Sequence, residues 1–128
     1  MISVLVVDDQ PDVRLAFGFM LEALGCRVGE ASDGREAVAY LAKNRPDVVL
    51  TDLYMPGMDG VALIQAIQNR PFPRPKIIAM SGAPNIGYQA SLQAAAIIGA
   101  DATLAKPVSK DTLLTTIRDL MGDKKPDH

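Results

Sequence analysis

The chain has 128 residues, 48% of them hydrophobic and 22% charged, which predicts one globular domain rather than a disordered chain. Its formal net charge of −2 and its lack of tryptophan argue against nucleic-acid binding, which usually uses a basic face. Because no apolar run approaches the ~20 residues of a membrane span and no signal-peptide pattern opens the chain, we expect a cytoplasmic protein that does not bind membranes.

The first half of the chain alternates short apolar runs with amphipathic segments. Residues 3–7 predict a buried strand, and residues 11–24 predict a helix with one apolar face. Residues 27–31 predict a more polar strand, as expected near the edge of a sheet, and residues 36–43 predict a second helix. Residues 48–51 are mostly aliphatic and β-branched, which indicates a strand buried on both faces.

The second half continues the same alternation. Residues 60–68 predict a helix, and three prolines make residues 70–75 an irregular connector. A strand over residues 76–80 precedes an alanine-rich helix within residues 84–98. Residues 102–105 predict the fifth strand.

A last helix at residues 110–121 completes five strands alternating with five helices. This pattern implies right-handed crossovers and a parallel sheet with helices on both faces. We therefore predict an α/β fold of the (βα)5 type, a doubly wound five-stranded parallel sheet of order 2-1-3-4-5 in three layers. We expect the domain to span residues 1–122, with a polar tail at 123–128, and the single cysteine, Cys26, to be a buried thiol.

Acidic residues end two of the predicted central strands. Asp8 and Asp9 follow the first strand, and Asp52 follows the third. In the predicted order these strands are neighbours at the switch point, where open α/β sheets bind their ligands. Three nearby carboxylates repel one another, and a hard divalent cation such as Mg²⁺ relieves the repulsion. We therefore expect a Mg²⁺ site at Asp8, Asp9 and Asp52.

Two further polar residues end the fourth and fifth strands. Ser81 offers a hydroxyl donor, and Lys106 offers a mobile positive charge. Together with a metal and an ionised Asp52 as nucleophile, they supply the groups needed to form and hold an acyl phosphate. Either residue alone is more often an ordinary strand-end or surface side chain, so their joint placement carries the argument. Asp59 and Gly60 are better explained as the start of a helix.

Four motifs together resemble the signatures of the two-component response-regulator receiver domain, and the likeness covers almost the whole chain. They are Val6-Val7-Asp8-Asp9, Thr51-Asp52-Leu53-Tyr54-Met55-Pro56-Gly57-Met58-Asp59-Gly60, Met80-Ser81-Gly82 and Lys106-Pro107. The resemblance implies a flavodoxin-like or CheY-like fold and a phosphoacceptor module of a phosphorelay. It also implies a cis peptide bond between Lys106 and Pro107.

The resemblance further implies individual roles at the site. Asp52 would be the phosphoacceptor, Ser81 the switch hydroxyl and Lys106 the cation that binds the phosphoryl group. The implied metal ligands are Asp9 directly, Asp8 largely through water, Asp52, and the backbone carbonyl of Tyr54.

The resemblance also implies partners. The phosphodonor would be a sensor histidine kinase or a histidine phosphotransfer protein that docks beside the first helix, with Arg14 on its exposed side, and beside Lys106 and Pro107. A downstream protein, or a phosphorylation-dependent second copy of the chain, would bind the face of the fourth helix, fifth strand and last helix. We expect a stand-alone receiver with no enzymatic activity beyond its own phosphorylation and dephosphorylation.

Three residues depart from the family pattern. Thr103 stands where receivers usually carry an aromatic residue, so the output route would differ. Tyr54 and Ala83 offer no acid or amide to orient a hydrolytic water, which predicts a long-lived phosphorylated state.

Three other functions compete with the receiver. A Mg²⁺-dependent aspartyl phosphatase of the haloacid-dehalogenase type fits poorly, because its acids form an Asp-x-Asp at the first strand. A flavodoxin-like electron carrier would need a Ser/Thr/Gly-rich phosphate loop after the first strand. A receiver that no longer accepts phosphate and serves as a scaffold is disfavoured by the presence of all five site residues.

Overall fold

The structure is a computed structural model, and it describes residues 1–53, 59–70, 73–82 and 98–122. The strands are β1 (Ser3–Val7), β2 (Arg27–Ala31), β3 (Val48–Asp52), β4 (Lys76–Ser81) and β5 (Ala102–Ala105). The helices in the described part are α1 (Pro11–Ala23), α2 (Gly34–Lys43), α3 (Gly60–Gln68) and α5 (Lys110–Met121). The predicted helix at residues 84–98, all but its last residue, and the predicted tail at 123–128 lie outside the described residues.

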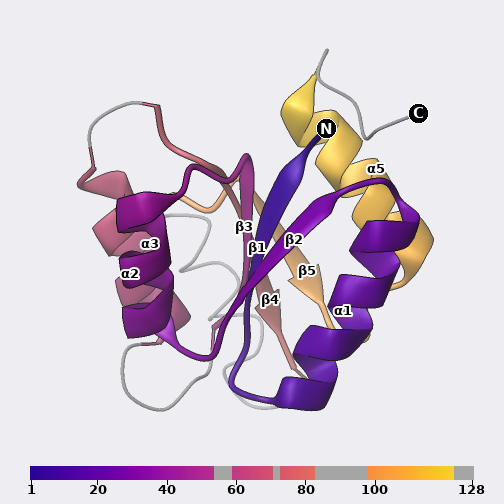
Figure 1. Cartoon of the computed structure of the whole chain (residues 1–128), viewed down its shortest axis with the longest axis horizontal. Helices are drawn as coiled ribbons and strands as arrows, with labels where there is room; N and C mark the ends of the chain where they lie inside the picture. Colours follow the sequence, from indigo (N-terminus) through magenta and orange to yellow (C-terminus); the bar gives the residue numbers. More distant parts are fainter. Residues whose placement is uncertain (54–58, 71–72, 83–97, 123–128) are drawn as a thin grey trace.

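The five strands form one parallel sheet in the order β2-β1-β3-β4-β5, as the sequence predicts. Figure 1 shows α1 and α5 against one face of this sheet and α2 and α3 against the other, which gives three layers. The more polar β2 lies at an edge, again as predicted. Among the described helices, none combines the length and the hydrophobicity needed to cross a bilayer.

The central strands are buried on both faces because their side chains alternate between two cores. In β1, Val4 and Val6 pack in a cluster with Phe17 and Leu21 of α1. The other face of β1 contributes Leu5 and Val7 to a second cluster, whose members come from α2, α3 and the sheet. This alternation follows from the period-two geometry of a strand, and it explains why the central runs are apolar at every position.

Helix α2 begins at Gly34, two residues before the predicted start. The carboxylate of Asp33 accepts a hydrogen bond from the backbone N–H of Glu36, and the carboxylate of Glu36 accepts one from the N–H of Ser32. These reciprocal bonds satisfy the N–H of Glu36, which the first turn leaves without a helical partner, and the N–H of Ser32 just before the helix. The bond from Ser32 also lowers the pKa of Glu36.

Cys26 is buried, as predicted from its being the only cysteine. Desolvation raises the pKa of its thiol, and the negative charge of Asp47 raises it further. The thiol is therefore a neutral, weakly reactive member of the core beneath α1 and α5.

Candidate functional site

The register of the sheet brings the carboxyl ends of β1, β3, β4 and β5 to one edge. Val7 pairs with Thr51, Asp52 with Met80, and Ser81 with Ala105. The residues at or just beyond these pairs are Asp8, Asp52, Ser81 and Lys106. The sheet therefore gathers at one edge side chains that the sequence separates by up to 98 positions.

Asp8 is fixed by a hydrogen bond to each of its polar groups. Its backbone N–H donates to the carbonyl of Ala31 at 3.1 Å, and its own carbonyl accepts from Nη1 of Arg14 at 2.6 Å. Its carboxylate accepts from the N–H of Gln10 at 3.0 Å and from Nζ of Lys106 at 2.7 Å. Because Asp8 is 0% exposed, these bonds offset the cost of burying its charge.

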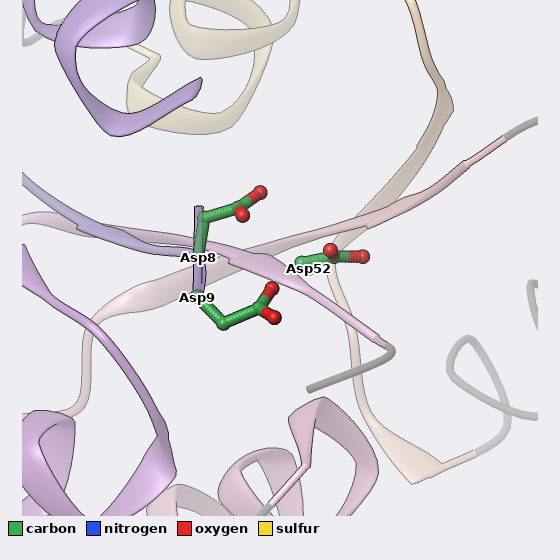
Figure 2. A group of neighbouring side chains, drawn as sticks. All are labelled: Asp8, Asp9 and Asp52. Carbon is green, nitrogen blue, oxygen red and sulfur yellow. The ribbon is translucent and has the colours of Figure 1, made fainter. Parts of the chain in front are cut away.

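Figure 2 shows the carboxylates of Asp8, Asp9 and Asp52 directed to the same side of the strand ends. One carboxylate oxygen from each lies within 4.8 Å of the others, and Asp9 is exposed while Asp52 is 8% exposed. Three oxygens at this spacing, two rigid and one open to solvent, fit a small hard cation such as Mg²⁺. The fourth ligand implied by the sequence, the carbonyl of Tyr54, lies outside the described residues.

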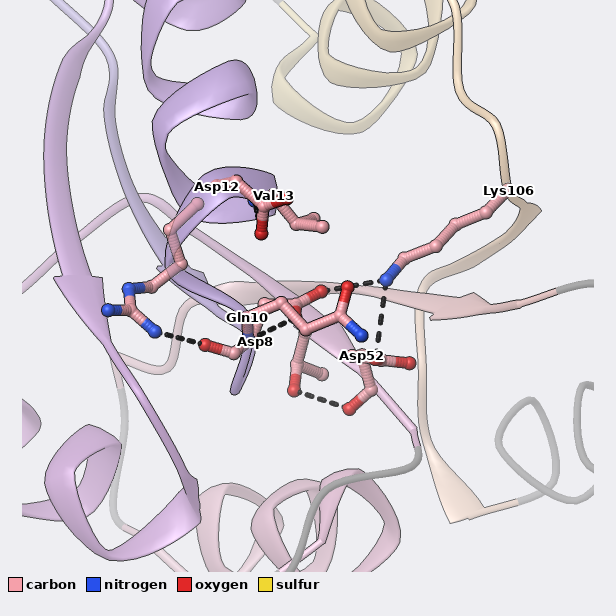
Figure 3. Close-up of polar contacts among 8 residues, drawn as sticks. Asp8, Gln10, Asp12, Val13, Asp52 and Lys106 are labelled. Carbon is pink, nitrogen blue, oxygen red and sulfur yellow. Dashed lines mark hydrogen bonds and ion pairs between the residues drawn. The ribbon is translucent and has the colours of Figure 1, made fainter.

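Lys106 extends from the end of β5 across the site (Figure 3). Its Nζ donates to the carboxylate of Asp8 at 2.7 Å and to that of Asp52 at 3.3 Å. Burial lowers the pKa of this lysine, but the bond to Asp8 and the charge of Asp52 raise it by more, so the net pKa lies above the usual value. Lys106 therefore carries its charge at neutral pH and balances part of the acidic group.

Ser81 ends β4 and is 1% exposed. Its carbonyl accepts the backbone N–H of Lys106 at 2.8 Å, which joins the ends of β4 and β5 beside Asp52. The peptide bond between Lys106 and Pro107 is cis, as the resemblance implied. Asp59, by contrast, caps α3 by accepting the N–H of Ala62 at 2.9 Å, so its interpretation as a helix start is confirmed.

Two contributors to the site were not predicted from the sequence. Gly60 lies so close to the backbone of β3 that a Cβ there would overlap the carbonyl oxygen of Asp52. Arg14 was expected on the exposed side of α1, which is wrong: its side chain is 17% exposed and joins the carboxylate of Glu30 to the carbonyl of Asp8. The Asp-Gly pair at the start of a helix could have indicated that Gly60 lies close to another backbone segment. Helical spacing alone does not indicate that Arg14 contacts the site.

An apolar pocket of about 550 Å³ adjoins Lys106, between α1 and the start of α5. Its walls include Val13, Phe17, Met20 and Val108. On the outer side of α1, Leu15 and Phe19 are 55% and 65% exposed. Because they are four residues apart on a helix, Leu15 and Phe19 lie on one side of α1 and form an exposed apolar pair.

Comparison with known proteins identifies the group to which this arrangement belongs. The model of the response regulator receiver domain family matches residues 4–118. The chain belongs to this family. Receiver domains of two-component systems accept a phosphoryl group, exchange it with histidine kinases or phosphotransfer proteins, and bind Mg²⁺ through an acidic cluster of the kind formed by Asp8, Asp9 and Asp52.

Individual relatives support the assignment to the receiver family. The chain is 32% identical over 118 residues to protein PilG of Pseudomonas aeruginosa, covering 91% of this chain and 85% of PilG. It is 37% identical over 114 residues to the sensor histidine kinase RcsC of Salmonella typhimurium, covering 89% of this chain but only 12% of RcsC. A high-resolution structure of the chemotaxis response regulator CheY4 of Vibrio cholerae superposes with a TM-score of 0.80 at 30% identity, covering 94% of this chain and 98% of that one.

Proposed function

We propose that Asp52 is the phosphoacceptor of this receiver, within a domain that spans residues 1–122 and works in the cytoplasm. The observation that supports Asp52 most directly is its position. Its carboxylate ends a central strand, lies within 4.8 Å of the oxygens of Asp8 and Asp9, and lies 3.3 Å from Nζ of Lys106. A nucleophilic carboxylate kept ionised beside a cation is what formation of an acyl phosphate requires.

In the proposed step, an oxygen of Asp52 forms a bond to phosphorus while the bond from phosphorus to the donor breaks. With a phosphohistidine donor the P–N bond breaks, and the imidazole leaves and takes up a proton from solvent. A bound Mg²⁺ would neutralise charge on the phosphoryl oxygens, and Asp8, Asp9 and Asp52 would hold it together with the carbonyl of Tyr54. The chain thereby catalyses its own modification and turns over no other substrate.

Lys106 and Ser81 would stabilise the product. The Nζ of Lys106 would move from its bond with Asp52 to a phosphoryl oxygen, a short shift because it already spans Asp8 and Asp52 at 2.7 and 3.3 Å. The hydroxyl of Ser81, at the adjacent end of β4, would donate to another phosphoryl oxygen. Both groups would donate hydrogen bonds from fixed positions to the negatively charged oxygens of the phosphoryl group on Asp52.

We also propose that a sensor histidine kinase or histidine phosphotransfer protein docks over α1 and the loop at Lys106 and Pro107. The apolar pocket beside Lys106 and the exposed Leu15 and Phe19 support this surface. A donor helix packed there would place its histidine near the carboxyl ends of the strands. Phe19→Ser should therefore slow transfer from a protein donor and leave transfer from acetyl phosphate unchanged.

We predict that the output surface consists of the fourth helix, β5 and α5. It would bind a downstream protein or a second phosphorylated copy of the chain. Of this surface the structure describes β5, where Thr103 is half-buried, and α5. We expect Gly82 and Gly87 to give the segment after Ser81 backbone freedom, Tyr88 to supply the aromatic group that Thr103 lacks, and residues 94–98 to anchor a partner. Of these, Gly82 and residue 98 are described, and the others lie outside the described residues.

Intact mass spectrometry after treatment with acetyl phosphate tests the assignment of Asp52. We expect one phosphoryl addition that requires Mg²⁺, is lost in chelator and is lost in Asp52→Asn. Addition that persists in Asp52→Asn at the same stoichiometry, or that forms equally well in chelator, would contradict the proposal. Asp119→Asn, an exposed acid on α5, is the matched control and should be modified like the wild type.

A further inference from the structure

The opposite edge of the sheet, where the strands begin, carries a second pocket. This edge is at the top of Figure 1. The loop before β3 (residues 44–47) and the segment leading into β4 (residues 73–76) line it, together with Arg70 and the end of α5 at Met121. Its volume is about 410 Å³. Five-residue strands separate it from Asp52 by about 16 Å, so it is distinct from the acidic site.

Backbone hydrogen bonds hold the walls of this pocket in place. The N–H of Lys76 donates to the carbonyl of Asp47 at 2.9 Å, and the carboxylate of Asp47 accepts the N–H of Ser3 at 2.8 Å. The guanidinium of Arg70 donates to the carbonyl of Leu41 at 2.9 Å, which joins the ends of α3 and α2. The pocket is therefore formed before any ligand arrives, which lowers the cost of binding.

The pocket concentrates positive charge in a protein whose net charge is negative. Four of its lining residues are cations, Arg45, Arg70, Arg74 and Lys76, against the single acid Asp47. The carboxyl ends of α2, α3 and α5 face the same region and balance about one and a half units of this excess, since each helix end carries roughly half a negative charge. The lining keeps a net positive charge of about one to two units.

The hydrogen bond of Arg70 leaves its charge available, because its guanidinium donates to a backbone carbonyl, which is a neutral acceptor. In the part of the chain that the structure describes, Arg45, Arg70 and Lys76 form no ion pair with a carboxylate. Arginine and lysine placed in this way recognise phosphate groups.

The remaining walls of the pocket are apolar. They are formed by Leu41, Pro46, Pro73, Pro75 and Met121. Proline rings and a methionine side chain offer flat or adaptable surfaces on which a planar ring can lie. A ligand that matches both halves of the pocket combines a phosphate with a planar ring system, and the volume is in the range that holds such a molecule.

We propose that this pocket binds a nucleotide. The phosphate lies against Arg45, Arg70 and Lys76, and the base lies against the proline and methionine wall. The site belongs to the loops at the amino-terminal edge of the sheet, and neither the acidic cluster nor the phosphorylation chemistry takes part in it.

Titration of ¹⁵N-labelled protein with ADP, followed by amide chemical shifts, tests the proposal. The experiment is run in chelator, so that Asp8, Asp9 and Asp52 cannot bind a metal–nucleotide complex. We expect saturable shifts at the amides of Asn44, Arg45, Asp47, Arg74 and Lys76, and none at the carboxyl ends of the strands. Adenosine and inorganic phosphate should each bind more weakly than ADP, by a factor of about ten or greater, because each contacts only half of the pocket.

Paired charge variants separate a specific site from general attraction to cations. Arg45→Glu and Lys76→Glu should each weaken ADP binding about tenfold, since each replaces a phosphate partner with an acid. Arg35→Glu, at the other end of α2, makes the same charge change away from the pocket and should leave binding unchanged. Shifts that never saturate, an equal loss in Arg35→Glu, or inorganic phosphate binding as tightly as ADP would each overturn the proposal.

Discussion

Replacement of Lys106 by methionine should destabilise the metal-free protein by about 2–4 kcal/mol. The Nζ of Lys106 lies 2.7 Å from the carboxylate of Asp8 and 3.3 Å from that of Asp52. Even with the dielectric constant of water, these contacts together contribute about 2.8 kcal/mol, of which ordering the lysine side chain offsets up to about 2 kcal/mol. Leaving the buried carboxylate of Asp8 without this partner adds about 1–3 kcal/mol, so the loss is substantial.

Urea unfolding in chelator and in Mg²⁺ measures the effect of this substitution. In chelator Lys106→Met should unfold at lower urea, while Lys110→Met, the same change at an exposed lysine of α5, should differ from wild type by a few tenths of a kcal/mol at most. Saturation with Mg²⁺ at about a hundred times its Kd adds about 2.7 kcal/mol to the wild type and more to Lys106→Met, since the lysine no longer competes for Asp8. Equal losses for the two lysine variants in chelator would refute the electrostatic reasoning.

Three further predictions concern the surroundings of the site. Gly60→Ala should lower the free energy of unfolding by about 1–3 kcal/mol and slow phosphorylation, because the added Cβ would push on the backbone of Asp52. Circular dichroism during unfolding measures the first effect, and intact mass spectrometry measures the second. The thiol of Cys26 should resist alkylation in the native state and react in urea. Because its folded-state pKa is raised from 9.0, the free energy of unfolding should fall more steeply above pH 9.0 in the wild type than in Cys26→Val, in which only the loss that other groups such as Lys106 cause above pH 10.5 remains. Arg14→Ala should lower the free energy of unfolding by about 1–2 kcal/mol, because it removes the hydrogen bond to the carbonyl of Asp8. It should slow phosphorylation by acetyl phosphate as much as by a protein donor, and slowing with the protein donor alone would support a docking role for Arg14 instead.

The sheet and its site edge were predictable because each depends on local pattern. Apolar runs predicted five buried strands, alternation with helices predicted a parallel order, and residues at the carboxyl ends of neighbouring strands must then converge. The convergence of Asp8, Asp52 and Lys106 needs only backbone topology. For this reason the acidic cluster, the position of Lys106 and the helix cap at Asp59 were all anticipated.

Features that depend on how long side chains cross between elements were not predictable. Helical spacing assigns Arg14 to a side of α1 but cannot say that its guanidinium reaches Glu30 of β2 and the carbonyl of Asp8. The prolines at residues 70–75 predicted a connector, yet only the folded chain brings its arginines beside Arg45 and Asp47. The start of α2 was missed by two residues because capping by Asp33 outweighs the low helix propensity of Gly34.

The bond between Lys106 and Asp8 joins residues 98 positions apart, and that between Lys106 and Asp52 joins residues 54 apart. During synthesis the amino-terminal strands emerge from the ribosome long before β5. A nascent chain can therefore bury Asp8 and Asp52 without their cation, and it acquires that cation only when the last strand adds to the edge of the sheet. The chain should therefore accept phosphate only after the whole sheet has formed. A chain truncated before residue 106 should not be phosphorylated, even where its first three strands have paired.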